Sequence, residues 1–473
     1  MYADKEILEF PKILNKLKQF AVTDLAKIDI MTIEPSTNLL LIQTMLSEIE
    51  MAKIAIERLE ETPLTGVLNI KEALSRARVG SVLSIDELLK IVSHEEAVAR
   101  SERYLRKIKQ LEISFGLLSP YYDSLEPHPA IRKAINECIS QKGEIYDNAS
   151  MELARIRKKV EIAQKRIEDK MESMLRSEAS KLTDSIITIR NNRLVLPVKS
   201  EYKNSFQGIV HDQSASKETV FMEPMACVHL NNDLQTLLLE EEQEIERILM
   251  MLSALVQEEV ASYEENLSVF TSLDIIYAKA KYAHEISANT VTFADTIDLK
   301  NARHPLIKAN DVVANTIFFD QYKTIVITGP NTGGKTVALK TLGLLALMLQ
   351  SGMQIPVDEG SKTRVFSNVF ADIGDEQSIE QSLSTFSSHI TKIIYILRHL
   401  TKESLILLDE LGSGTDPKEG ASLAMSLLDH IRAKHVYAMV TTHYPELKLY
   451  AYSHFNAMRY VRDNSQSIIS IYI

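Results

Sequence analysis

The first part of the chain alternates helical hydrophobic patterns with short polar turns. Residues 1–147 repeat apolar side chains every three or four positions, and turn segments such as EPSTN (34–38) and ETPLTG (61–66) interrupt this repeat. Such a period is typical of amphipathic helices, and Pro, Gly, Ser and Asn commonly end them. The pattern predicts an all-α region, which we interpret as the first part of a helical core.

From Asn148 the apolar positions follow a coiled-coil spacing over two long runs. The first run comprises Leu153, Ile156, Val160, Ala163, Ile167, Met171 and Met174, and the second comprises Leu230, Leu234, Leu237, Ile245, Ile248, Leu252 and Leu255. Between them, residues 185–224 alternate apolar and polar positions around an NN turn, as β-strands do. We therefore predict that residues 148–263 form an antiparallel coiled-coil arm with a β-rich tip. Residues 264–298 are predicted to be helical and to lead the chain back into the helical core.

The charges of the two helical runs are complementary. Residues 151–170 carry a local net charge of +3, whereas the segment from Glu240 to Arg247 carries −4. Opposite charges on facing helices favour pairing over self-association of either helix. Two separate solvated helices remain the alternative interpretation.

Residues 299–473 have the pattern of an α/β domain. Short apolar runs at 323–329, 363–374, 404–410 and 437–443 are interleaved with helical patterns. Buried strands that alternate with helices predict a parallel sheet with crossover helices. The predicted fold class is thus multidomain, with an all-α core, an inserted arm and a P-loop ATPase domain.

The segment GPNTGGKT follows a predicted strand and precedes a predicted helix, which is the context of a P-loop. Glycines let backbone amides converge on phosphate oxygens, and the helix N-terminus favours negative charge. Lys335 is predicted to bind the β- and γ-phosphates of ATP, and the Thr336 hydroxyl to bind Mg²⁺. The predicted nucleotide-binding residues here are Gly329, Pro330, Asn331, Thr332, Gly333, Gly334, Lys335 and Thr336.

The second half of the predicted ATP site lies in LILLDE, an apolar strand that ends in two carboxylates. Asp409 is predicted to hold the Mg²⁺ shell, and Glu410 to orient or deprotonate the attacking water. His443 follows another strand, YAMVTT, and is predicted to sense the γ-phosphate; alone, such a histidine is more often structural. The predicted catalytic residues are Glu410, Lys335 and His443.

Composition and charge limit the compartment and the binding partners that this chain can have. The net charge of −11 confines any nucleic-acid contact to a local patch, and Cys138 and Cys227 lack metal-ligand spacing. Neither a signal peptide nor an apolar run of membrane-spanning length is visible, so we expect a cytoplasmic protein without membrane contact. The β-rich tip supplies the basic patch: Arg190, Arg193, Lys199 and Lys203 are candidate phosphate contacts, with a solvated tip as the alternative. We interpret His211 as structural.

Three segments, TGPNTGGKT, DELGSGTD and TTHYPEL, resemble the ATPase domain of the MutS family within the ABC superfamily. The segment ADIGDEQSIEQSLSTFSSH resembles its MutS-two branch, and similarity extends upstream through IITIRNNRLVLPVK, GIVHDQSAS and LNNDLQ. The resemblance implies a homodimer in which Ser384 contacts the γ-phosphate bound by the other chain. It also implies that the arm clamps nucleic acid, with DNA in recombination suppression or a stalled ribosome as the substrate.

Two features depart from that branch. The chain ends 30 residues after His443, without the Smr nuclease domain, so we expect no nuclease activity from these residues. The tail MRYVRDNSQSIISIYI does not resemble the branch's continuation, which completes the sheet and stabilises the dimer.

Three other classes of protein fit these motifs less well. ABC transporter ATPases place their signature farther from the P-loop, and SMC-like ATPases insert their coiled coil after it. A non-hydrolysing scaffold whose arm binds protein is the third alternative, and the intact Lys335, Asp409 and Glu410 argue against it.

Overall fold

A computed structural model of the chain describes all residues except 192, 320–322, 329–333, 375–381, 455, 463–466 and 472–473. The side chains of residues 382–386, 388 and 452–471 are also outside the description. The chain forms two units, one made of residues 1–67, 99–125 and 266–473 and the other of residues 68–98 and 126–265. Helices α5 (Ile85–Gln110) and α10 (Val260–Glu285) contribute residues to both units.

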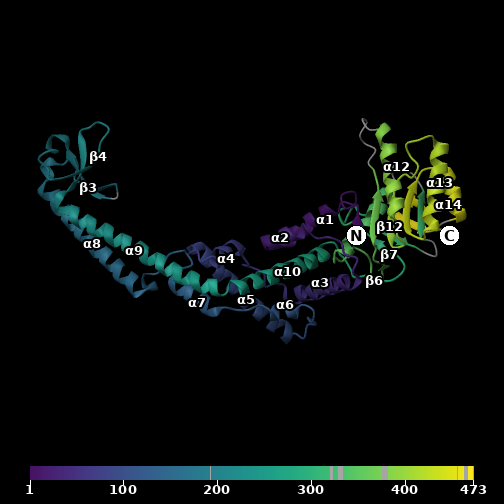
Figure 1. Cartoon of the computed structure of the whole chain (residues 1–473), viewed down its shortest axis with the longest axis horizontal. Coiled ribbons are helices and arrows are strands. Elements are labelled where there is room, and N and C mark those ends of the chain that lie inside the picture. The colour runs from purple at the N-terminus through teal and green to yellow at the C-terminus, as the bar shows by residue number, and fades with distance from the viewer. Residues whose placement is uncertain are drawn as a thin grey trace. The chain divides into compact units, whose positions relative to one another are not determined.

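The first unit contains two sheets and the helices that cover them (Figure 1). Its helices are α1 (Phe10–Leu17), η1 (Lys18–Phe20), α2 (Asp24–Ile30), α3 (Leu39–Leu59), α6 (Ser119–Asp123), α11 (Lys335–Gln350), α12 (Ser382–His399), α13 (Pro417–Ala433) and α14 (Pro445–His454). Its strands are β1 (Tyr2–Ala3), β6 (Thr292–Phe293), β7 (Asp298–Ala302), β8 (Asn315–Phe318), β9 (Thr324–Thr328), β10 (Lys362–Thr363), β11 (Asn368–Asp372), β12 (Ser404–Leu408), β13 (Tyr437–Thr442), β14 (Asn456–Arg462) and β15 (Ser467–Ile471).

The larger sheet has the order β1-β11-β12-β13-β9-β14-β15, and its strands are parallel except for β15. Successive side chains of a strand point to opposite faces of the sheet. Ile325 and Leu407 accordingly pack in a core shared with α11, whereas Val326 and Ile406 pack in a second core with α12, α13 and α14. The parallel sheet expected from the apolar runs is therefore present, with helices on both faces.

Close packing fixes the position of α11 on the sheet. A side chain on Gly343 would place its Cβ 2.5 Å from Leu407 Cδ1 and 2.6 Å from Leu8 Cδ2. Any larger residue would force these buried leucine side chains to shift, so glycine lets the helix approach β12 closely. This contact positions the N-terminus of α11, where Lys335 and Thr336 lie.

The predicted all-α character of residues 1–147 is wrong at the N-terminus. Tyr2 and Ala3 form β1, which pairs in parallel with Asn368 and Val369 of β11. A two-residue strand is too short to produce a periodic pattern, so sequence alone did not reveal it. The smaller sheet, of order β6-β10-β7-β8, was also not anticipated, and β6 lies in the 264–298 stretch that was expected to be helical.

The C-terminal tail adds two strands to the larger sheet. β14 pairs in parallel with β9, and β15 pairs antiparallel with β14. The segment that was expected to depart from the family's continuation thus extends the sheet beside the strand that leads to the P-loop.

The second unit contains two long helices that lie side by side and end at a small sheet (Figure 1). Its helices are α4 (Lys71–Arg78), α7 (Pro129–Cys138), η2 (Asp147–Ala149), α8 (Met151–Ser177), η3 (Ala179–Lys181), η4 (Ser200–Tyr202) and α9 (Met225–Glu258). Its strands are β2 (Thr188–Arg190), β3 (Arg193–Lys199), β4 (Gly208–Gln213) and β5 (Thr219–Pro224), in the antiparallel order β2-β3-β5-β4.

Helices α8 and α9 run antiparallel, joined by apolar and polar contacts. Ile167 and Met171 of α8 pack with Cys227 at the start of α9. Farther along, Arg157 Nε donates to Glu241 Oε1 at 2.8 Å. The charge complementarity noted in the sequence therefore corresponds to an ion pair between these helices.

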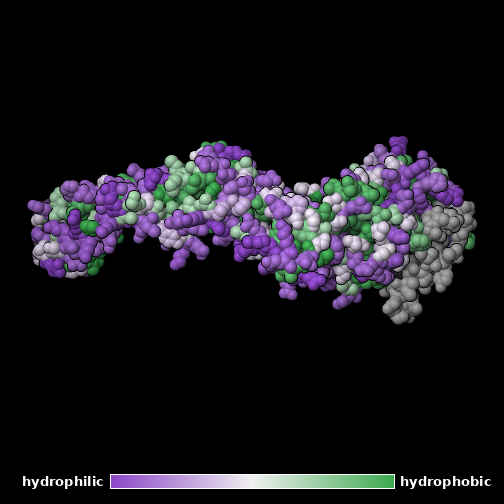
Figure 2. All heavy atoms as spheres, turned by 90° about the horizontal axis from the view of Figure 1, so that it is seen from below, coloured by the Kyte–Doolittle hydropathy of each residue, from purple (hydrophilic) through white to green (hydrophobic). Residues whose placement is uncertain are grey.

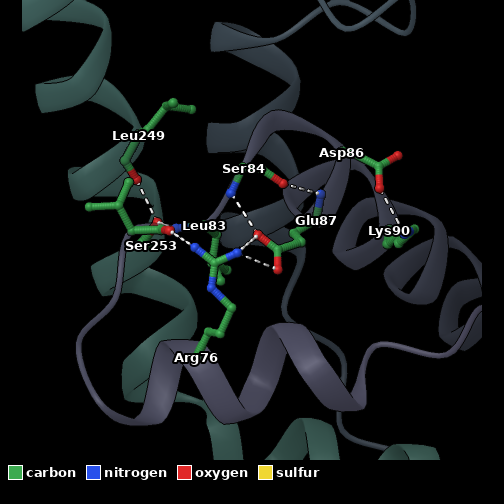
Figure 3. A network of polar contacts seen from close by, with 9 residues as sticks. Arg76, Leu83, Ser84, Asp86, Glu87, Lys90, Leu249 and Ser253 are labelled. Atoms are coloured by element: carbon green, nitrogen blue, oxygen red, sulfur yellow. Dashed lines mark hydrogen bonds and ion pairs between the residues drawn. The ribbon is translucent and has the colours of Figure 1, made fainter.

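Polar contacts also fasten the α4–α5 connection to α9 within this unit (Figure 3). The Ser253 hydroxyl accepts a hydrogen bond of 2.8 Å from the Leu83 amide and donates one of 2.7 Å to Leu249 O. Arg76 binds both carboxylate oxygens of Glu87 at 3.0 Å. Arg76 Nη2 also donates to Val82 O at 2.8 Å, so one guanidinium holds both the connection and the start of α5.

Candidate nucleotide-binding site

Lys335 is the first residue of α11 and is only 2% exposed. Gly334 precedes it with φ 81°, a left-handed conformation that glycine adopts without strain. Burial lowers the pKa of the Lys335 ammonium, and the nearby Glu410 and Asp409 carboxylates oppose that shift. A buried cation at a helix N-terminus, facing two carboxylates, is suited to a strongly negative ligand.

Thr336 and Asp409 meet at the edge of the sheet where β12 ends. Thr336 Oγ1 donates a hydrogen bond of 2.7 Å to Asp409 Oδ2. The other carboxylate oxygen of Asp409 accepts from the Thr441 hydroxyl, which in turn accepts from the Glu410 amide at 2.8 Å. Both oxygens of the Asp409 carboxylate are thus held, one by the Thr336 hydroxyl and the other by the Thr441 hydroxyl.

Glu410 adopts an uncommon backbone conformation. Its φ of 48° lies in the left-handed region, which costs a non-glycine residue about 1 kcal/mol or more. Hydrogen bonds retain this turn: the Leu411 amide donates to Thr441 O at 3.0 Å, and the Ser413 amide donates to Glu410 O at 3.0 Å. Backbone strain of this kind, here directly after the hydrogen-bonded Asp409, is typical of functional sites.

The loop after Glu410 is packed tightly against α13 and the end of β13. A Cβ on Gly412, which has φ +90°, would lie 2.6 Å from Gly420 O. Tyr444 donates its hydroxyl to Gly412 O at 2.9 Å. Glycine is therefore required at this position, and the GSG spacing seen in the sequence has a structural cause.

The remaining predicted nucleotide-binding residues have different positions. His443 directly follows Thr442, the last residue of β13, and is exposed; its ring centroid lies 4.5 Å from that of Tyr444, with the rings tilted by 36°. Ser384 belongs to α12, but its side chain lies outside the description. Gly329, Pro330, Asn331, Thr332 and Gly333 lie outside the described residues.

Two polar residues at this edge were missed in the sequence, Asp372 and His389. The Asp409 amide donates to Asp372 O at 2.9 Å, and His389 Nδ1 donates to Asp372 Oδ2 at 2.9 Å. Both residues line the same small cleft as Asp409 and Glu410. The available signal was that Asp372 ends a predicted buried strand, because ligand-binding residues gather at the carboxyl ends of parallel strands.

The residues present fit ATP with Mg²⁺. Hard cations prefer oxygen ligands, and the Thr336 hydroxyl and Asp409 carboxylate lie close enough to share one ion. Lys335 adds a buried positive charge where the P-loop leads into α11. Among the described residues, at this site and outside it, no group of three or more His, Cys, Asp and Glu residues is arranged to hold a metal ion.

The four candidate nucleic-acid residues of the tip differ in their contacts. Arg190 lies 4.2 Å above the Phe221 ring and 3.1 Å from Asp212, and Lys199 Nζ donates to Ser180 O at 3.0 Å. Arg193 binds Glu223 at 3.2 Å and Asn232 at 2.6 Å, whereas Lys203 is exposed. Hydrophilic side chains cover much of the visible tip surface, on the left in Figure 2.

Glu223 forms the centre of a polar network inside the tip. Its side chain is 2% exposed and accepts hydrogen bonds from His211 Nε2 and Asn231 Nδ2, each at 2.7 Å, in addition to Arg193. A buried carboxylate requires such partners. His211 is thus a structural ligand of Glu223, as the sequence suggested, and Arg193 shares that structural role.

Within the described residues, no helix is both long enough and apolar enough to cross a membrane.

Comparison with known proteins identifies the class of the domain that carries this site. Residues 325–469 match the family described as MutS domain V. The match includes β9, α11, β12 and β13, and it extends through most of the tail. The tail therefore resembles the family more than the sequence segment alone indicated.

The chain is also similar over most of its length to proteins named Endonuclease MutS2. The chain is 46% identical over 456 residues to Endonuclease MutS2 of Bacillus velezensis and 43% identical over 457 residues to that of Halothermothrix orenii. Each alignment covers 95% of this chain and 58% of the relative. The chain belongs to the MutS family, in its MutS2 branch, and spans about three fifths of the length of these curated relatives.

Proposed function

We propose that this chain is an ATPase that binds ATP and Mg²⁺ at the N-terminus of α11. The observation that carries the proposal is the contact between Thr336 and Asp409 beside the buried Lys335. These residues come from two segments far apart in the chain, yet they bring two oxygen ligands and a buried cation together at one position. The match to MutS domain V over the same elements supports it.

We assign the binding of ATP and Mg²⁺ to residues at the start of α11 and at the end of β12. The Lys335 ammonium neutralises the β- and γ-phosphates, and the backbone amides at the start of α11 face them. Thr336 and Asp409 supply two oxygen ligands to Mg²⁺. The metal, when bound, withdraws charge from the phosphate oxygens.

Hydrolysis is assigned to Glu410. Its carboxylate orients the attacking water and accepts a proton from it, while the Thr441 hydroxyl holds the Glu410 amide. His443, at the end of the next strand, is proposed to donate a hydrogen bond to the γ-phosphate. Preorganised groups of this kind lower the barrier because they need not reorient during the reaction.

A second chain is proposed to complete the site. By the resemblance to MutS proteins, Ser384 at the start of α12 contacts the nucleotide held by Lys335 of its partner in a homodimer. Mixing Ser384→Arg chains with Lys335→Ala chains should give one intact site per heterodimer and restore part of the activity. Heterodimers without recovered hydrolysis would count against a shared site.

The α8–α9 arm is proposed to clamp nucleic acid through its tip. The exposed Lys203 and the half-buried Arg190 and Lys199 offer phosphate contacts, and the names of the relatives point to a nucleic-acid substrate. Binding of ATP would bias the dimer toward one arrangement of its arms, and hydrolysis would reverse that bias.

The proposal is tested by comparing duplex DNA, branched DNA and ribosomes as binding partners over a range of salt concentrations, with and without ATP. The proposed clamp binds at least one of them, and its affinity depends on nucleotide. Affinity for all three that is unchanged by ATP, in a chain that hydrolyses ATP, would overturn the clamp while leaving the ATPase assignment intact.

A further inference from the structure

Asp372 makes two contacts that connect different parts of the nucleotide site. It is the last residue of β11, pairs in register with Leu408, and is 8% exposed. Its backbone oxygen accepts a 2.9 Å hydrogen bond from the Asp409 amide, while its carboxylate accepts one of 2.9 Å from His389 Nδ1. One residue therefore joins the proposed Mg²⁺ ligand to helix α12.

The imidazole of His389 is confined by its surroundings. A Cβ on Gly374 would lie 3.1 Å from His389 Cε1, which is tighter than ordinary van der Waals contact. Glycine at this position thus leaves room for the ring to reach Asp372. His389 also lines the cleft that contains Asp409 and Glu410.

A parallel contact lies one turn farther along α12. Lys392 Nζ is 3.3 Å from Asp4 Oδ1, and Asp4 Oδ2 accepts a 2.8 Å hydrogen bond from the Ala371 amide. Positions 389 and 392 are three residues apart and share one face of the helix. Two consecutive residues of β11 are therefore linked to the same face of α12 by polar side chains.

We propose that His389 is a positioning residue for ATP hydrolysis, which couples α12 to Asp409 through Asp372. This inference rests on the proposed ATPase function and extends it, because α12 also carries Ser384. A displacement of α12 changes the hydrogen bond from His389, and the Asp372 backbone transmits that change to the Asp409 amide. His389 thus connects α12, whose Ser384 is proposed to contact the nucleotide of the partner, with Asp409, the proposed Mg²⁺ ligand of its own chain.

The test compares His389→Leu and His389→Asn with wild type in the full chain. Leucine removes the donor, so kcat should fall roughly 10- to 100-fold, the usual effect of misplacing a reacting group by about 1 Å. ATP affinity should stay within about threefold, because Lys335 and Thr336 are untouched. Asparagine retains a side-chain N–H donor near the position of Nδ1, so it should restore most of kcat.

His399→Leu is the matched control. His399 lies on the same helix, is exposed, and contacts the carbonyl of Tyr395 at 2.7 Å rather than the sheet. Its replacement should leave kcat unchanged. A kcat for His389→Leu equal to that of His399→Leu would overturn the inference. So would an equal loss of kcat in His389→Leu and His389→Asn that is accompanied by a lower melting temperature of both variants.

Hydrogen exchange separates this inference from the ATPase proposal. The Asp409 amide should exchange faster in His389→Leu than in wild type without nucleotide, because its acceptor is less firmly held. Unchanged exchange would contradict the coupling even if the wild type hydrolyses ATP. If the Asp409 amide exchanges faster in His389→Leu but the wild type does not hydrolyse ATP, the coupling stands and only the ATPase proposal is refuted.

Discussion

Thr336 donates a hydrogen bond of 2.7 Å to Asp409, although 73 residues separate them in the chain. Two packing relationships bring them together: Gly343 lets α11 approach β12, and β12 ends at Leu408 beside the start of that helix. The side chains therefore meet at an edge that the parallel sheet defines. Oxygen ligands that are already adjacent need little reorganisation to bind a cation.

Removing the Thr336 hydroxyl should weaken the dependence of ATP binding on Mg²⁺. Thr336→Val preserves shape but removes one proposed ligand, so ATP affinity should respond less to added Mg²⁺ than in wild type. Thr341→Val is the control on the same helix, because that hydroxyl donates only to Val337 O at 2.6 Å. Titrations at several Mg²⁺ concentrations that coincide for Thr336→Val and wild type would contradict the assignment.

Glu410→Gln should separate binding from turnover. The amide cannot accept a proton from water, so kcat should fall about 10²- to 10⁴-fold while ATP affinity is retained. Glu419→Gln is the control, because Glu419 is exposed in the first turn of α13. Phosphate release at a wild-type rate from Glu410→Gln would rule out its role as the base.

Lys279 of α10 should make the stability of the chain depend on alkaline pH. Its ammonium donates to Ser351 O, at the C-terminus of α11, at 2.8 Å, and burial lowers its pKa from 10.5 to about 8 while Glu48 opposes the shift. Between these values the unfolded chain keeps the proton that the folded chain loses. The free energy of unfolding therefore gains a term that increases with pH across this window.

Comparing Lys279→Met with wild type isolates that term. The difference between their denaturant unfolding curves should change from pH 7 to pH 10, with wild type gaining relative stability as pH rises. Parallel pH profiles for the two proteins would show that Lys279 is not protonated differently in the folded and unfolded states.

The tip should bind nucleic acid mainly through phosphate contacts. If Lys203 contacts phosphate, Lys203→Gln should reduce the slope of log affinity against log salt by about 1 per arm, with ATP binding unchanged. Lys434→Gln, another exposed lysine, should leave that slope unaltered. Matched and mismatched duplexes should bind alike, so a strong mismatch preference, or a slope insensitive to Lys203, would contradict the phosphate-contact proposal.

Much of the nucleotide site could be predicted because its motifs are local. The P-loop glycines, the apolar strand before Asp409 and the order of elements each follow from short segments. The Asp372–His389 contact could not be predicted, since it depends on how α12 packs across β11. Basic residues of the tip show a similar limit: charge alone does not reveal that Arg193 binds the buried Glu223.

The fold shows the same division between local and long-range information. Alternation over 185–224 predicted strands, and the described residues of this range form four strands, β2 to β5. The pairing of β1 with β11 was invisible, because it joins two residues at the N-terminus to a strand more than 360 residues away. Long-range pairing of short segments leaves no periodic signal in the sequence.

Calorimetric titration of ATP with Mg²⁺ into wild type, Lys335→Ala and Lys340→Ala tests the central claim most directly. Both lysines lie on α11, but Lys335 is 2% exposed beside Asp409 and Glu410, whereas Lys340 lies 4.0 Å from Glu9. We predict that wild type and Lys340→Ala bind ATP with similar affinity and that Lys335→Ala binds about 10- to 100-fold more weakly, because a charge-assisted contact is lost. Equal affinities for wild type and Lys335→Ala, or no binding by wild type, would contradict the account.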